Sequence, residues 1–193
     1  GRDWLTYGRS YKEQRHSPLT QINKSNLGEL GLAWTIDLGT KRGIQSTPLV
    51  VDGIMFMSGP WSVVYAIDAR KGKLLWTFDP EVDRSRAMVN CCGVVNRGLA
   101  IYKGSVFVAT LDGSVYSLDA ADGSVNWEAE AFEADGTYYS STGAIRLFDG
   151  KVLIGNGGAE FHARGYVSAF DAATGELAWR FYTVPGNPAL PFE

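Results

Sequence analysis

The chain has 193 residues, of which 45% are hydrophobic, a composition typical of a folded domain rather than a disordered chain. Lys and Arg number 18 and Asp and Glu number 21, so the formal net charge is −3. This balance makes nucleic-acid binding through phosphate contacts a poor hypothesis. No apolar run approaches the roughly 20 residues that a membrane-spanning helix needs. The opening residues GRDWLTYG show neither an initiator Met nor an apolar leader, so any secretory signal is expected to be absent from this chain or already removed.

Internal repeats dominate the sequence. The segments 66–76, 117–127 and 169–179 align without gaps, and each contains an Asp-Ala pair, then a Gly, then a Trp at fixed spacing. A degenerate copy at 28–34 keeps the final Trp. The four tryptophans, at positions 34, 76, 127 and 179, are 42, 51 and 52 residues apart. This interval fits one four-stranded β-propeller blade plus a variable loop.

Apolar alternation and turn signals predict four strands in each repeat. In chain order, the predicted strands are 47–51, 54–57, 63–67, 74–78, 98–102, 105–110, 114–118, 124–128, 144–148, 152–154, 166–170 and 177–181. Asp52-Gly53, Lys103-Gly104 and Asp149-Gly150 predict tight hairpin turns. In the repeat itself, the Asp is expected to accept backbone N–H bonds, the Gly to adopt positive φ and the Trp to pack between blades. The predicted fold is therefore an all-β propeller of four-stranded blades.

The number of repeats predicts an incomplete propeller. About three full blades and one partial blade are fewer than most propellers need to close, since closure takes roughly 4–8 blades. The final stretch, 188–193, is Pro-rich and is typical of a loop. Residues 1–193 are therefore expected to be part of a single propeller domain of a longer protein.

The adjacent pair Cys91-Cys92 holds the only two cysteines of the chain. One interpretation is two buried thiols on a loop. The other is a disulfide between neighbours, which would be strained, because consecutive Cα atoms about 3.8 Å apart lie below the usual disulfide range. Such a bond would require an oxidising compartment. Residue spacing alone leaves both interpretations open.

A Gly-rich stretch, 155–165, separates two predicted strands of the third repeat. Its Gly-Gly-Ala run would let the backbone approach a flat ligand closely, and Glu160 could offer an oxygen ligand to a hard cation. The alternative is a Gly-rich hairpin with a solvated Glu. Trp61 could be a lid over a cofactor or a filler between blades. His16 and His162 are expected to have surface or structural roles.

Taken together, these motifs resemble those of the quinoprotein alcohol dehydrogenases, which depend on pyrroloquinoline quinone (PQQ) and include methanol and ethanol dehydrogenases. The matching segments extend over essentially the whole chain: 4–9, 15–19, 21–23, 91–98, 156–160 and 180–186. The Cys-Cys-x-Val-Val-Asn-Arg-Gly and Gly-Gly-Ala-Glu elements are the most specific of them. The resemblance implies an eight-bladed propeller of which this chain is the N-terminal part, about three full blades and a partial one.

The resemblance also implies a role for individual residues. Cys91 and Cys92 would form a vicinal disulfide that stacks on the quinone, and Arg97 would bind a PQQ carboxylate. Glu160 would be a ligand of the metal, usually Ca²⁺ with a lanthanide as the alternative, which polarises a carbonyl of the quinone. Further cofactor contacts are expected from Gln45, Thr142, Gly157, Gly158 and Ala159.

Three positions depart from the family pattern. Gln45 stands where Glu is common, which would keep a hydrogen bond and lose a charge; Gly93 replaces a common Asp and His162 a common Gly. The catalytic Asp, a metal-ligating Asn and a cationic residue over the quinone are expected beyond position 193. No catalytic residue is therefore predicted within the chain, and the isolated chain is expected to be inactive.

The parent protein is expected to be an enzyme that oxidises a primary alcohol to an aldehyde with PQQ and Ca²⁺. Its electrons would pass to a cytochrome c or to a fused haem domain, and the bacterial periplasm is the expected location. The main alternative is a non-catalytic propeller scaffold or binding module. Outer-membrane assembly propellers share the Asp-Ala-x-x-Gly-x-x-x-Trp repeat without the Cys pair. Glucose-type membrane quinoproteins add membrane spans and generally lack that pair.

Overall fold

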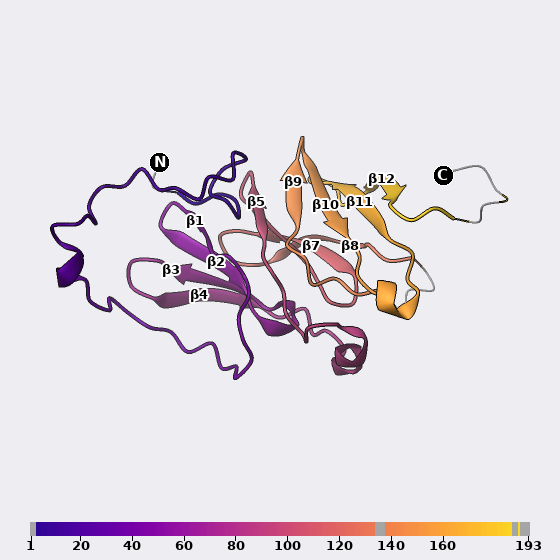
Figure 1. Cartoon of the computed structure of the whole chain (residues 1–193), viewed down its shortest axis with the longest axis horizontal. Coiled ribbons are helices and arrows are strands. Elements are labelled where there is room, and N and C mark those ends of the chain that lie inside the picture. Colours follow the sequence, from indigo (N-terminus) through magenta and orange to yellow (C-terminus); the bar gives the residue numbers. More distant parts are fainter. Residues whose placement is uncertain (1–2, 134–137, 187–188, 190–193) are drawn as a thin grey trace.

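The computed structural model describes residues 3–133, 138–186 and 189, and within them the protein consists of antiparallel sheets joined by loops (Figure 1). Three four-stranded sheets follow one another along the chain, and in each of them strands adjacent in sequence are adjacent in space. We call them blades 1 to 3. Blade 1 comprises β1 (Leu49–Val51), β2 (Ile54–Ser58), β3 (Val64–Asp68) and β4 (Lys73–Phe78). Blade 2 comprises β5 (Ala100–Tyr102), β6 (Ser105–Ala109), β7 (Ser114–Asp119) and β8 (Val125–Glu130). Blade 3 comprises β9 (Arg146–Phe148), β10 (Lys151–Gly155), β11 (Tyr166–Asp171) and β12 (Leu177–Tyr182).

The predicted strands are confirmed in all three described blades, with ends that differ by no more than two residues. The first strand of each blade begins later than predicted. In blade 1 Pro48 has no N–H to donate to a ladder. In blade 2 the N–H of Gly98 donates to the Asn96 side chain at 3.0 Å. In the part of the chain that the structure describes, four short 3₁₀ segments lie in the loops: η1 (Leu27–Glu29), η2 (Pro60–Ser62), η3 (Arg84–Val89) and η4 (Ala159–Phe161).

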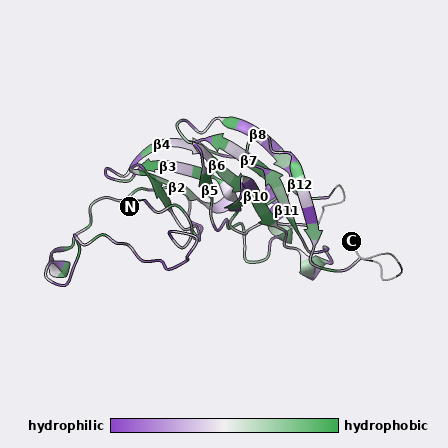
Figure 2. Ribbon diagram, turned by 90° about the horizontal axis from the view of Figure 1, so that it is seen from above, coloured by the Kyte–Doolittle hydropathy of each residue, from purple (hydrophilic) through white to green (hydrophobic). Residues whose placement is uncertain are grey.

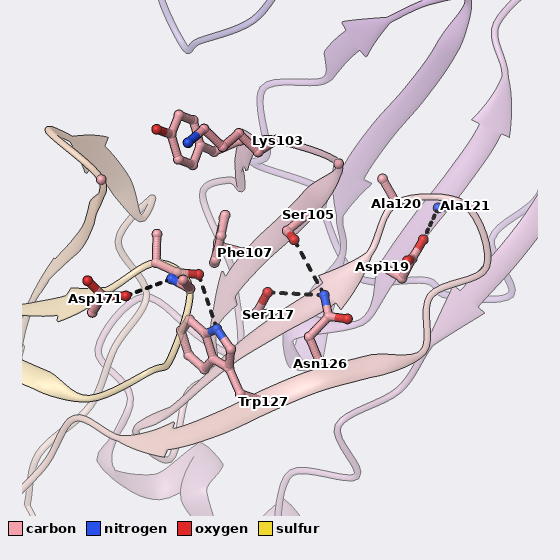
Figure 3. A pocket seen from close by; sticks show the side chains of 15 residues that line it. Lys103, Ser105, Phe107, Ser117, Asp119, Ala120, Ala121, Asn126, Trp127 and Asp171 are labelled. Atoms are coloured by element: carbon pink, nitrogen blue, oxygen red, sulfur yellow. Dashed lines mark hydrogen bonds between the residues drawn. The ribbon is translucent and has the colours of Figure 1, made fainter.

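The repeated Trp docks each blade onto the next, as the sequence predicts. The indole Nε1 of Trp76 donates to the Ala120 carbonyl at 3.1 Å, and that of Trp127 to the Ala172 carbonyl at 3.2 Å (Figure 3). The ring covers the Gly of the same turn: a Cβ at Gly123 would lie 2.6 Å from the Trp76 indole. Only Gly allows this approach, and its φ of +78° also favours Gly.

The degenerate repeat at 28–34 forms no strand, yet its Trp34 docks in the same way. Its Nε1 donates to the Ala69 carbonyl at 3.0 Å, and its ring covers Gly72. Ile36 and Leu38 pack beside it against blade 1. The segment predicted as a partial blade thus makes the Trp docking contact although it forms no sheet. Apart from Ala189, the Pro-rich stretch 188–193 lies outside the described residues.

The core lies between neighbouring blades. One cluster joins β3 to β6 and β7 through Val64, Val106, Val108 and Leu118, and a second joins blades 2 and 3 through Phe107, Val152 and Phe170. The last strand of each blade, β4, β8 and β12, lies along the outer arc and exposes most of its residues (Figure 2). Among the residues described, no helix has the length and apolarity needed to cross a bilayer.

Candidate functional site

The antiparallel topology sorts the connections between strands into two ends of the molecule. The turn end carries the tight turns 52–53, 103–104 and 149–150 together with the three repeated Asp-Ala-x-x-Gly turns. The loop end carries the connections 59–63, 79–99, 110–113 and 156–165, together with the described parts of the β8–β9 connection, 131–133 and 138–145. Every site residue predicted from the sequence lies in a connection at the loop end or, for Gln45, in the segment that enters β1 there.

The turn end has a cleft of its own, which is separate from the loop-end connections. A cleft of about 820 Å³ opens between blades 2 and 3, lined by Lys103, Asp119, Asn126, Trp127 and Asp171 among others (Figure 3). Its carboxylates are already occupied, since Asp119 and Asp171 accept backbone N–H bonds in their own turns. None of the predicted site residues lines this cleft.

Cys91 and Cys92 follow η3, where Cys92 and Gly93 both adopt positive φ, +68° and +83°. Both side chains are exposed and both are free thiols, with their Sγ atoms 2.8 Å apart. The structure therefore contains no vicinal disulfide, and the interpretation as buried thiols is wrong as well. Hydrogen bonding with Cys92 raises the pKa of the Cys91 thiol, and the charges of Glu160 and Arg97 act on that pKa in opposite directions.

Arg97 and Thr142 join blade 2 to the loop before blade 3. The Arg97 N–H donates to the Thr142 carbonyl at 3.1 Å, and its Nη1 donates to Thr142 Oγ1 at 2.5 Å and to the same carbonyl at 3.2 Å. Arg97 is half-buried, and no carboxylate within the described residues pairs with it. This leaves the guanidinium charge available for an anionic ligand.

Hydrogen bonds hold the Gly-rich loop against the loop that carries Thr142. Gly157 and Ser140 form an isolated β-bridge, in which the Gly157 N–H donates to the Ser140 carbonyl at 2.7 Å. Gly158 has φ +105°, and a Cβ there would lie 2.1 Å from the Tyr138 carbonyl oxygen. This position therefore requires Gly, which explains the second Gly of the motif in steric terms.

Glu160 lies on η4, directly after Ala159, and its side chain is exposed. In the described part of the chain, no group of three His, Cys, Asp or Glu side chains is close enough to hold a metal ion. Glu160 can therefore supply one carboxylate to a metal, and a hard cation with 6–8 oxygen ligands would need further ligands from elsewhere. His162 ends η4 with φ +69° and is exposed, as expected for a residue without a buried role.

The structure places Gln45 and Trp61 in two different environments. Gln45 is exposed, and it connects to the rest of the site through its neighbour Ser46, whose Oγ accepts the Ser58 N–H at 3.1 Å. Trp61 packs against a buried cluster of Val82, Val94 and Leu111. The guanidinium of Arg84 lies 4.3 Å from its ring centroid. These contacts, with connections that follow blade 1 and lie within blade 2, favour the interpretation of Trp61 as a filler between blades over that of a cofactor lid.

Several polar residues at the loop end are buried, among them Asn90, Asn96 and Ser141. Asn90 Oδ1 and Ser141 Oγ are buried without a hydrogen-bond partner in the described structure. They immediately precede Cys91 and Thr142. Their proximity in sequence to predicted site residues is the one available signal, because an isolated Asn or Ser does not reveal its burial.

Comparison with known proteins agrees with this geometry. The family model of the glucose/ethanol/alcohol dehydrogenase PQQ β-propeller domain matches residues 4–191. The quinohemoprotein alcohol dehydrogenase ADH-IIG of Pseudomonas putida is 54% identical over 191 residues, which cover 99% of this chain and 27% of that protein. The chain thus spans about a quarter of the length of the curated relatives it matches.

Solved structures give the same result. The crystal structure of quinohemoprotein alcohol dehydrogenase from Comamonas testosteroni superposes with a TM-score of 0.95 at 53% identity, covering 99% of this chain and 28% of that one. A europium-containing methanol dehydrogenase gives a TM-score of 0.88 at 36% identity, covering 96% of this chain and 32% of that one. Three four-stranded blades, the match to residues 4–191 and these similarities together lead to one conclusion: the chain belongs to the PQQ-dependent glucose/ethanol/alcohol dehydrogenase β-propeller family.

Proposed function

We propose that the protein carrying this sequence oxidises a primary alcohol to an aldehyde with PQQ and a metal ion, and that the loop end of blades 1 to 3 forms one side of the cofactor site. The observation that carries the proposal is the bonding of Arg97 to Thr142 and of Gly157 to Ser140, at the same end of a propeller of this family as the loop that carries the Cys pair. Residues 1–193 would then form the N-terminal part of a single PQQ-binding domain.

The residues present fit PQQ, a flat quinone with three carboxylates. Arg97 offers a half-buried guanidinium without a carboxylate partner in the described structure, which suits a ligand carboxylate. The orphaned Asn90 Oδ1 and Ser141 Oγ are polar atoms that a bound ligand or water could satisfy. Gly157 and Gly158 keep the loop free of side chains, so that backbone can approach a flat ring.

Each residue has a distinct task in this proposal. Arg97 binds a cofactor carboxylate and Thr142 orients the guanidinium. Glu160 supplies an oxygen ligand to Ca²⁺ or a lanthanide, and Gln45 donates a hydrogen bond from the blade 1 side. When bound, PQQ supplies a two-electron acceptor for the alcohol. A cytochrome c or a fused haem domain would then accept these electrons, as the word quinohemoprotein in the relatives' names supports.

Cys91 and Cys92 would act as a flat wall against the cofactor. We propose that the free thiols of the structure are oxidised to a vicinal disulfide in the periplasm, with loss of two protons and two electrons to a disulfide-forming oxidant there. A rigid disulfide would lose little conformational entropy when the cofactor binds. Mass spectrometry of the peptide that contains Cys91 and Cys92, taken from protein isolated from its host, should then find the two thiols oxidised to a disulfide, and finding both as free thiols would refute this step.

Reconstitution of the purified, complete protein tests the proposed function. With PQQ and Ca²⁺ added, it should oxidise ethanol in a dye-coupled assay and lose most of that activity when Ca²⁺ is removed with a chelator. Arg97→Ala should raise the PQQ concentration needed for half-maximal activity by about tenfold or more, because a charge-assisted hydrogen bond contributes about 1.5–3 kcal/mol.

The isolated 193-residue chain gives a second readout. We expect it to bind PQQ without oxidising ethanol, because no catalytic base is predicted within it. Alcohol oxidation by this chain would contradict that prediction. Absence of PQQ binding by the complete protein would instead favour the non-catalytic scaffold.

A further inference from the structure

Asn96 directly precedes Arg97, a residue of the proposed cofactor site, yet its own side chain is turned into the interior. It is 1% exposed. A buried amide is costly unless its polar atoms are paired, and the pairing capacity of a side-chain amide is two donated and about two accepted bonds. The partners of Asn96 therefore show what this residue holds together.

The four bonds of Asn96 reach several elements of the loop end. Its Oδ1 accepts from Ser58 Oγ at 2.8 Å and from the Gly98 N–H at 3.0 Å. Its Nδ2 donates to the Ala109 carbonyl at 2.8 Å and to Ser62 Oγ at 3.2 Å. Ser58 and Ser62 belong to blade 1 and its β2–β3 loop, whereas Ala109 ends β6 of blade 2.

The network continues from Asn96 to both sides of the proposed cofactor site. On the blade 1 side, the Ser58 N–H donates to Oγ of Ser46, the neighbour of Gln45. On the other side, Arg97 follows Asn96 directly and bonds to Thr142. Because Ser58, Ser62 and Asn96 are all almost completely buried, these links lie in the interior of the molecule, where water competes little.

From this connectivity we propose that Asn96 is a positioning residue, which fixes Arg97 relative to the Gln45 segment across the seam between blades 1 and 2. The inference rests on the proposed function, because its ligand is PQQ. Truncating Asn96 would leave the Ser58 and Ser62 hydroxyls, the Gly98 N–H and the Ala109 carbonyl without their partner. The two sides of the seam could then shift independently, and Arg97 would no longer be held at the distance that a cofactor carboxylate requires.

A double-mutant cycle on PQQ affinity tests this role in the complete protein with saturating Ca²⁺. PQQ affinity is measured by quenching of Trp fluorescence for the wild type, Asn96→Ala, Arg97→Ala and the double variant. If Asn96 acts through Arg97, Asn96→Ala alone should weaken PQQ binding about tenfold. In the Arg97→Ala background the same change should weaken binding by less than about twofold.

Two further variants separate positioning from general loss of stability. Val106→Ala removes buried core volume in the same blade without touching the network, and it should lower the melting temperature while changing PQQ affinity by less than about twofold. Ser58→Ala removes a single bond of Asn96 and should weaken PQQ binding about threefold. It serves as the test variant if Asn96→Ala does not fold.

The outcomes are distinguishable. Coupled losses in the cycle together with unchanged affinity in Val106→Ala support the positioning role. Equal affinity of Asn96→Ala and wild type, additive losses in the cycle, or a loss in Val106→Ala as large as that in Asn96→Ala would overturn it. Failure of the wild type itself to bind PQQ would refute the proposed function, and the inference with it.

Discussion

The turn end and the loop end of the blades differ in whether their residues and contacts repeat from blade to blade. At the turn end, the same Asp, Gly and Trp recur, and Trp34, Trp76 and Trp127 make the same contact with the Gly of the following turn, Gly72, Gly123 and Gly175. At the loop end, no two of the described connections are alike, and each residue with a proposed role occurs once. Repetition therefore accounts for how the blades stack, whereas the proposed chemistry is confined to the end where the repetition stops.

The difference is also visible in how polar groups are satisfied. Asp68 and Asp171 at the turn end accept hydrogen bonds from the backbone of their own turns. The polar side chains of the loop end reach across elements instead, as Arg97 does to Thr142 and Asn96 does to Ser58. Because the hydrogen bonds of each turn are local, each turn is independent of its neighbours. Because the hydrogen bonds of the loop end join distant elements, the loops depend on one another.

Gly158→Ala should have the largest effect on cofactor binding. The new Cβ would overlap the Tyr138 carbonyl oxygen and separate the Gly-rich loop from the Thr142 loop. We expect a loss of PQQ affinity of about a hundredfold or more, measured by fluorescence titration of the complete protein. Gly143→Ala, whose Cβ would meet no atom within 4 Å, is the matched control and should bind normally. Normal binding by Gly158→Ala would show that the Gly-rich loop takes no part in holding the cofactor.

Gly123→Ala applies the same change at the turn end and should have the opposite consequence. The Cβ would collide with the Trp76 indole, and Ala would be strained at φ +78°. We expect the free energy of unfolding to fall by about 2–4 kcal/mol in urea titrations. PQQ affinity of the folded fraction should stay close to that of the wild type. A selective loss of PQQ affinity here would contradict the division between the two ends.

Arg97→Lys should have an intermediate effect. Lys keeps the positive charge but lacks the planar fork that bonds to Thr142 and to a carboxylate at the same time. PQQ affinity should fall about tenfold with little change in melting temperature. Wild-type affinity in this variant would show that charge alone matters at this position.

Asp171→Asn should have the smallest effect of these variants, and that effect should disappear in acid. Backbone N–H bonds from Ala173 and Thr174 lower the pKa of its carboxyl group. A lowered folded-state pKa stabilises the protein above the unfolded pKa of about 4, and this contribution is lost as the pH falls through the folded pKa.

The measurement is the difference in melting temperature between wild type and Asp171→Asn. It should be present at about pH 6 and should shrink below about pH 4. A difference that does not change with pH would show that the charge of Asp171 has no part in stabilising its turn.

The sequence predicted the turn end almost completely and the loop end only in part. Strand positions, turn carboxylates and Trp docking all repeat, so each blade supports the interpretation of the others. At the loop end, the structure bonds Arg97 to Thr142 and bridges Gly157 to Ser140, while the cofactor roles that the family resemblance implies for these residues stay predictions. Burial of Asn96 could not be predicted, because its four partners come from positions 58 to 109 and only the folded blades bring them together.

Two other features also depend on folded geometry or on conditions. Trp34 docks without any strand around it, since the contact needs only an indole and the next blade's Gly. The state of Cys91 and Cys92 is set by redox conditions, which the order of residues does not encode.

The most direct test of the account is a crystal structure of the complete protein with PQQ and Ca²⁺ bound. We predict a PQQ carboxylate within hydrogen-bond distance of the Arg97 guanidinium, a Glu160 oxygen on the metal and the quinone plane against Cys91 and Cys92. PQQ bound elsewhere, such as in the cleft between blades 2 and 3 at the turn end, would contradict the assignment of cofactor chemistry to the loop end.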